Sequence, residues 1–247
     1  MHRPGEFGGP EDGPAPWEAV ARDRLSGAMR RFAGPLAELV QRGANEGDTR
    51  LLVTDFLSDA LNYNKYGELT TEYRTKGESV DYGIVLEDEL FALIEVKPVG
   101  QSLDNRNLRQ AKLQAVSENV EWVILTNGSV WQVHHFPADE SGASELIIDV
   151  DVLDDEARDT TVDALFHLSR EAVQNGRLDD LRKWRAALGP APLADALRST
   201  RVVTAIRAEL RRRTGHAGHV GDSDEIVRAL ADDVVARGLL DTAGGEG

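Results

Sequence analysis

The stretch "VDYGIVLEDELFALIEVKP", residues 80–98, decides the fold of this chain. Its two apolar runs flank a short acidic turn, a pattern that predicts a β-hairpin. Each run also carries charge, with Asp81 in the first and Glu95 and Lys97 in the second. Charged side chains are seldom buried unless they are paired, so these three residues require an explanation.

Alternation of side chains along a strand predicts which charges of the hairpin share a face. Successive side chains point to opposite faces of a sheet, so Glu95 and Lys97 are expected on one face with Phe91 and Leu93. The same alternation puts Asp81 on one face with Gly83 and Val85, and the pairing of the two strands decides whether Glu95 shares that face.

The pairing of the two strands depends on where the turn lies. If the turn centres on Asp88, residues at equal distances from it pair, and Asp81 lies opposite Glu95. Opposite residues have Cβ atoms roughly 5 Å apart, so two carboxylates there repel each other. The repulsion requires a cation or a proton to resolve it.

A divalent cation is one resolution of this repulsion. Mg²⁺ takes one or two protein carboxylates together with waters and phosphate oxygens. Lys97, about 7 Å along the strand from Glu95, can then place its ammonium at a scissile phosphate, where it positions the attacking water and offsets negative charge. The alternative is a solvated sheet face on which Lys97 is the ion-pair partner of the acids, and a register slip of one residue separates the pair.

The rest of the chain predicts an α/β protein with a mixed sheet. Helical periodicity is expected at 17–40, interrupted near Gly34-Pro35, and at 45–62 and 102–119. Strands are expected at 68–75, 79–86, 90–98, 121–128, 130–136 and 145–152. Beyond Asp151 the pattern is helical, at about 155–174, 178–188, 192–213 and 223–237, so we expect a domain boundary near residue 153. Residues 1–14 are rich in Gly and Pro and are expected to be a disordered tail.

Composition restricts the function classes. The absence of cysteine excludes disulfides and thiolate metal sites, and no nucleotide-binding glycine motif is present. The formal net charge of -15 argues against an extended nucleic-acid surface but leaves room for a local basic groove. No apolar run approaches the roughly 18 residues of a membrane span, and the N-terminal residues lack the apolar core of a signal peptide. A cytoplasmic protein with no membrane partner is expected.

Four segments together resemble the PD-(D/E)xK nuclease domain at the N-terminus of type I restriction enzyme R subunits: "TEYRTKGESVDYGIV", "FALIEVKP", "LRQAKLQA" and "VEWVILTNGSVWQVHHF". The resemblance extends over residues 45–152, and its most specific part is E-x-K on a strand that follows a strand with an Asp. It implies a restriction-endonuclease-like mixed sheet flanked by helices at 15–152, with an α-helical C-terminal extension at 153–247. No helicase motor, which R subunits carry behind this domain, is recognisable in this chain.

The resemblance also implies roles for individual residues. Asp81 and Glu95 match the metal-binding acids, and Lys97 matches the catalytic lysine. Gln110 matches the glutamine of a Q-x-x-x-Y motif, although Gln114 stands where the tyrosine is expected, and the proline of the "PD" is replaced by valine.

A further acid, Glu46, matches the acid on the first helix that completes the metal site in some of these nucleases. An equally good explanation for Glu46 is a surface residue in a first helical turn, which the helix dipole favours.

The function that the resemblance implies is Mg²⁺-dependent hydrolysis of DNA, with Mn²⁺ as a possible substitute, in restriction or another defence against foreign DNA. The alternative is a non-catalytic module of the same fold that binds nucleic acid or a protein.

The helical extension contains a basic stretch at 181–213 within an acidic chain. These basic residues can bind phosphates, or they can pair with acidic residues within the chain or across a dimer. An amphipathic pattern formed by Val202, Val203, Ile206 and Leu210 makes a homodimer through these helices a second possibility.

Overall fold

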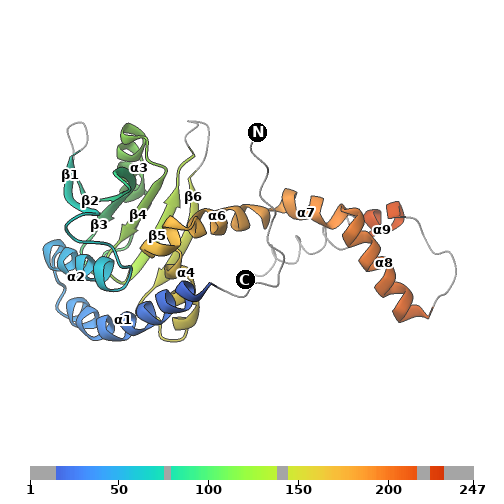
Figure 1. Ribbon diagram of the computed structural model, residues 1–247, viewed down its shortest axis with the longest axis horizontal. Helices are drawn as coiled ribbons and strands as arrows, with labels where there is room; N and C mark the ends of the chain where they lie inside the picture. The colour runs from blue at the N-terminus through green and yellow to red at the C-terminus, as the bar shows by residue number, and fades with distance from the viewer. Residues whose placement is uncertain (1–14, 75–78, 138–143, 216–222, 231–247) are drawn as a thin grey trace, which may run out of the picture. The chain divides into compact units, whose positions relative to one another are not determined.

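The computed structural model describes residues 15–74, 79–137, 144–215 and 223–230 (Figure 1). The expected disordered tail at 1–14 and the end of the helix expected at 223–237 lie outside these ranges. The chain forms two compact units, Met1–Arg182 and Lys183–Gly247. The first unit contains the sheet and the candidate site.

A single six-stranded sheet forms the centre of the first unit, and its strands lie in the order of the sequence. The strands are β1 (Leu69–Arg74), β2 (Ser79–Leu86), β3 (Glu89–Val96), β4 (Trp122–Thr126), β5 (Val130–His135) and β6 (Glu145–Asp151). Only β3 and β4 pair in parallel, and the helix α3 (Asn105–Glu118) connects them. Parallel neighbours require such a crossover, so the predicted mixed α/β sheet is confirmed.

The turn between β2 and β3 consists of Glu87 and Asp88, whose φ angles are 53° and 66°. Positive φ at both central residues is the property of a type I′ turn, which matches the twist of the two flanking strands. Acidic residues thus occupy a turn that more often contains Asn-Gly or Asp-Gly.

The assumption that the turn centres on Asp88 was wrong, because Leu86 pairs with Glu89 and the turn consists of Glu87 and Asp88. The paired register ends at Tyr82 and Ile94, and beyond it the Asp81 carboxylate accepts a hydrogen bond from the Val96 backbone N–H. Val80 and Tyr82, the neighbours of Asp81, belong to different core clusters, so alternation does not assign Asp81 to a face, and its pairing with Glu95 stays a prediction.

A β-bulge shifts the register nearer the turn, between Ile84 and Val85. Phe91 is the extra residue on β3, and it packs against the larger core cluster, whereas Leu93 belongs to the smaller cluster on the other face. The expectation that Phe91 shares a face with Leu93 was therefore wrong, because a bulge interrupts the alternation on which it relied.

The helices cover both faces of the sheet (Figure 1). The larger core cluster joins one face to α1 (Pro16–Gln41), α2 (Glu46–Asp59), α4 (Arg158–Phe166) and α5 (Arg170–Gln174). The smaller cluster lies under α3, and it includes Ala111 and Ala115 of that helix together with Leu93 and Val123 of the sheet. Glu95 alternates with Ile94 and Val96 of the larger cluster, so it lies on the face of the sheet that α3 covers.

Helix α1 continues through Pro35, although the sequence predicted an interruption there. A proline inside a helix removes one backbone hydrogen bond and costs about 3 kcal/mol. Leu36 and Leu39, which follow the proline, are both buried in the main core. Their burial offsets that cost, so tertiary packing overrides the local signal.

The two compact units divide after Arg182, well beyond the boundary that the sequence suggested near residue 153. Helix α4 belongs to the sheet unit because Val162, Leu165 and Phe166 lie in its core. The helix α6 (Arg177–Ala187) contains the point of division.

The second unit contains α7 (Pro190–Arg198), α8 (Thr200–Thr214) and α9 (Ser223–Ala229). The single helix expected at 192–213 is broken at Ser199, whose hydroxyl accepts a hydrogen bond from the Val202 backbone N–H and caps α8. Of the four apolar residues that the sequence singled out there, Val203 is buried and Leu210 is exposed.

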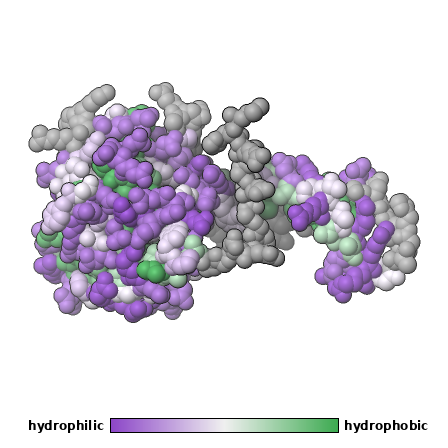
Figure 2. Space-filling view, viewed as in Figure 1, coloured by the Kyte–Doolittle hydropathy of each residue, from purple (hydrophilic) through white to green (hydrophobic). Residues whose placement is uncertain are grey.

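Hydrophilic residues cover most of the surface that Figure 2 shows, with only small apolar patches between them. Among the described residues, no helix combines the length and the apolar character needed to cross a bilayer.

Candidate active site

The candidate site lies at the end of the hairpin that is remote from its turn. Asp81 is near the start of β2, Glu95 is near the end of β3, and Lys97 follows β3 directly. The antiparallel register brings all three to the same end of the sheet. Their side chains are 12%, 10% and 15% exposed, respectively, so the group is largely removed from water.

The pKa of Glu95 differs from that of an ordinary glutamate. Burial raises the pKa of its carboxyl above the ordinary value, and the negative charges of Asp81 and Glu46 raise it further. Lys97 opposes this shift, because its Nζ lies 2.5 Å from Oε1 of Glu95. A carboxyl with a raised pKa and a specific charged partner is characteristic of functional sites.

Asp81 has two partners of its own. Its Oδ2 accepts a hydrogen bond from the Val96 backbone N–H at 2.8 Å, and its Oδ1 lies 3.2 Å from Nε of Arg50 on α2. Burial alone would lower the pKa of Arg50, but attraction to Asp81 and contacts with Tyr82 leave that pKa raised.

Sequence reasoning missed Arg50, because its partner is distant along the chain. The one available signal was its position four residues after Glu46, which puts both residues on one face of α2.

Two polar contacts fix α2 against the end of the hairpin. The Thr49 hydroxyl accepts a hydrogen bond from the Val99 backbone N–H at 3.0 Å, just beyond Lys97. The Tyr82 hydroxyl donates to the Arg50 carbonyl oxygen at 2.9 Å, and its ring centre lies 5.8 Å from Cζ of the Arg50 guanidinium. These contacts hold the start of α2 beside the charged residues.

Glu46 is the first residue of α2 and is partly buried. Its negative charge contributes to the raised pKa of Glu95. It also lies in a first helical turn, where the helix dipole stabilises an acid. Both explanations given for Glu46 from the sequence are therefore compatible with its position.

The acidic side chains of the candidate site can be compared with the ligands that Mg²⁺ requires. Among the described residues, no group of three histidine or acidic side chains is placed to hold a metal ion. Mg²⁺ requires fewer protein ligands, since it keeps several waters and binds through one or two carboxylates plus phosphate oxygens. The carboxylates of Asp81 and Glu95 are of the right kind and close enough for the charge of Asp81 to act on Glu95, so they fit such an ion.

Gln110 lies apart from this group. It is exposed on α3, whereas Gln114, one turn later, is buried. No hydrogen bond within the described ranges joins Gln110 to Asp81, Glu95 or Lys97. The role that the resemblance implies for Gln110 stays a prediction.

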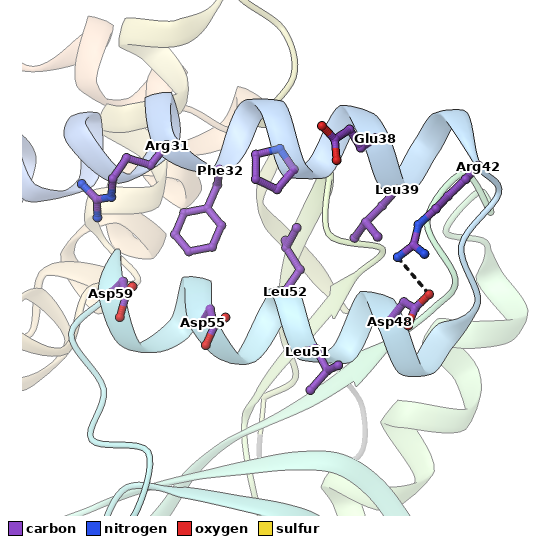
Figure 3. Close-up of a pocket in the computed structure, with 11 residues that line it drawn as sticks. Arg31, Phe32, Glu38, Leu39, Arg42, Asp48, Leu51, Leu52, Asp55 and Asp59 are labelled. Carbon is purple, nitrogen blue, oxygen red and sulfur yellow. Dashed lines mark ion pairs between the residues drawn. The ribbon is translucent and has the colours of Figure 1, made fainter.

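Two surface pockets lie away from these charged residues. A groove of about 670 Å³ runs between α1 and α2, and the Arg42–Asp48 ion pair closes one end of it (Figure 3). Apolar residues lie between its charged walls: Phe32, Pro35, Leu39, Leu51 and Leu52. A second, more polar pocket of about 520 Å³ follows α2 and includes Tyr66 and Arg170. Neither pocket contains a residue of the candidate site.

The candidate site therefore has three properties on which its chemistry can be judged: two paired acids, two adjacent cations and low exposure to water. Comparison of the chain with protein-family models, curated proteins and solved structures gives no match.

Proposed function

We propose that the protein is a Mg²⁺- or Mn²⁺-dependent nuclease that hydrolyses phosphodiester bonds in DNA. The observation that supports it is the convergence of Asp81, Glu95 and Lys97 at one end of the β2–β3 hairpin, with Glu95 buried and electrostatically coupled to Asp81. In this proposal the sheet unit has a restriction-endonuclease-like fold and serves in restriction or another defence against foreign DNA.

Each residue has a defined task in this proposal. Asp81 and Glu95 hold the cation, with Glu46 close enough to add negative charge. A bound divalent cation lowers the pKa of a coordinated water and offsets charge that develops on the phosphate. The Lys97 ammonium orients the attacking water and stabilises the negative charge of the transition state. Low exposure of all three side chains strengthens these electrostatic interactions.

A non-catalytic binding module is the second candidate. The observation that favours it is that each carboxylate already has a cation, Arg50 for Asp81 and Lys97 for Glu95. Such pairing can be purely structural, because a buried charge is tolerated when it is paired.

Cleavage of supercoiled plasmid and of single-stranded DNA separates the two candidates. We expect cleavage with Mg²⁺ or Mn²⁺, none with EDTA, and none for Asp81→Asn. Asp163→Asn is the matched control, since Asp163 also pairs with an arginine, Arg22, but lies on α4. DNA binding by a wild-type protein that cuts under no metal condition would favour the binding module.

A further inference from the structure

Arg50 is the most accessible member of the four-residue charged group. Its side chain is 27% exposed, against 12% for Asp81, 10% for Glu95 and 15% for Lys97. Its backbone carbonyl is held by the Tyr82 hydroxyl, and the Thr54 hydroxyl donates to the same oxygen at 2.8 Å. The backbone of Arg50 is thus fixed, while its long side chain borders solvent.

The charges of the group balance when no other ion is bound. Two carboxylates and two cations sum to zero, and the nearby Glu46 makes the total slightly negative. A divalent cation bound by Asp81 and Glu95 reverses this sign. Excess positive charge at low exposure attracts an anion strongly.

A cation on Asp81 also competes with Arg50 for the same carboxylate. One oxygen of Asp81 is occupied by the Val96 N–H, and the other lies 3.2 Å from Nε of Arg50. A metal ion that binds this second oxygen therefore repels the guanidinium of Arg50 and replaces it as the partner of Asp81. The released guanidinium is then available to bind another anion.

We infer that Arg50 is a phosphate-binding residue of the site, which pairs with Asp81 in the metal-free protein and with a substrate phosphate once a divalent cation is bound. The inference rests on the proposed function, because it takes Asp81 as a metal ligand. Arginine suits this role because its planar guanidinium can bind a phosphate through two parallel hydrogen bonds. The backbone contacts with Tyr82 and Thr54 keep the side chain within reach of both partners.

This exchange makes metal and DNA binding cooperative. Coupling between two ligands is reciprocal, so DNA must raise metal affinity by the same factor by which metal raises DNA affinity. Couplings of this kind are commonly about 5- to 150-fold. Removing the charge of Arg50 should reduce this coupling factor, whether it is measured as the effect of metal on DNA affinity or as the effect of DNA on metal affinity.

The test compares wild type with Arg50→Gln and Arg50→Lys in the full chain. Calorimetric titration with Mn²⁺ gives metal affinity without DNA, and fluorescence anisotropy of a labelled DNA oligonucleotide in Ca²⁺ gives DNA affinity. We expect Arg50→Gln to bind Mn²⁺ at least about fivefold more tightly and DNA at least about fivefold more weakly, with Arg50→Lys intermediate in both. Arg42→Met, which removes an arginine at the end of α1 that pairs with Asp48 on α2, should change neither.

The decisive result is that Mn²⁺ affinity rises while DNA affinity falls in the Arg50 variants. If Arg50→Gln and Arg50→Lys weaken both affinities, or change neither, Arg50 is structural and the inference fails. Its failure is distinguishable from failure of the proposed function. Wild-type cleavage with unchanged affinities in Arg50→Gln rejects only the role of Arg50, whereas opposite affinity changes without any cleavage reject only hydrolysis. If Asp81→Asn leaves Mn²⁺ binding unaltered, the role of Arg50 and the proposed function are both rejected.

Discussion

The Oδ2 atom of Asp81 accepts a hydrogen bond from the backbone N–H of Val96 at 2.8 Å, so a side chain of β2 is tied to the main chain of β3. This bond fixes the orientation of the carboxylate and leaves the other oxygen for Arg50. Asp81 therefore contributes to the packing of the hairpin as well as to the proposed chemistry, and its substitution should affect both.

Asp81→Asn is expected to lower the free energy of unfolding by about 1–3 kcal/mol, because it leaves the partly buried Arg50 without its counter-charge. Urea denaturation without metal measures the change. The double variant with Arg50→Gln should show a coupling of about 0.5–3 kcal/mol, since the two residues interact directly. An Asp81→Asn protein that is more stable than wild type would mean that repulsion from Glu95 outweighs the pairing with Arg50.

Glu95→Gln should change the pH dependence of stability in metal-free buffer. Because the pKa of Glu95 is raised in the folded protein, its protonated form favours folding, and that contribution is lost as the pH rises through the folded-state pKa. The free energy of unfolding of Glu95→Gln should therefore increase relative to wild type from about pH 4.5 upward, 4.5 being the ordinary pKa of the group.

Glu171→Gln is the control of opposite sign for this pH series. Burial alone would raise the pKa of Glu171, but its contacts with Arg24 and Asn62 leave that pKa lowered. Its contribution to stability is present above the unfolded-state pKa and is lost as the pH falls through the folded-state pKa. Curves of unfolding free energy against pH that run parallel for the two variants would contradict the assigned shifts.

Lys97→Ala is expected to separate metal binding from turnover. Removal of the ammonium 2.5 Å from Glu95 should leave Mn²⁺ affinity equal or higher, because a competing positive charge is gone. Cleavage should fall at least about 100-fold, the usual loss when one group that stabilises a transition state is removed. Mn²⁺ titration beside plasmid cleavage tests this, and a parallel loss of both would assign Lys97 a structural role.

Gly83→Ala should destabilise the hairpin by about 1–3 kcal/mol through overpacking. A Cβ at this position would lie 2.8 Å from Cδ2 of Tyr73 and 2.9 Å from Cδ1 of Leu90. Gly34→Ala in α1 is the matched control, since a Cβ there meets no atom within 4 Å, and it should stabilise by about 0.5–1 kcal/mol. Thermal unfolding of both variants tests the packing, and equal melting temperatures would contradict it.

Truncation should locate the end of the sheet unit. A chain that stops after residue 152 lacks Leu165 and Phe166 of the main core, so we expect it to unfold or aggregate. A chain that stops after Leu188 retains this core and should unfold cooperatively. Circular dichroism and gel filtration distinguish the two, and a cooperative transition in the shorter chain would move the boundary back toward residue 153.

The parts of the fold that the sequence predicted depend on residues close together in the chain. Alternation and turn residues located all six strands. The position expected for the turn was wrong, because Leu86 pairs with Glu89, and the register expected at Tyr82 and Ile94 arises from the bulge instead. The bulge that moves Phe91 to the other face was not predictable, because strand alternation carries no signal for one inserted residue.

By itself, the sequence determined the hairpin and the end of it at which Asp81, Glu95 and Lys97 gather, because the period of a strand and the φ angles of its turn are local properties. Only the tertiary structure decided that α1 runs through Pro35 and that Arg50 pairs with Asp81. Both outcomes depend on side chains that meet across separate elements, where burial and charge pairing outweigh local preference.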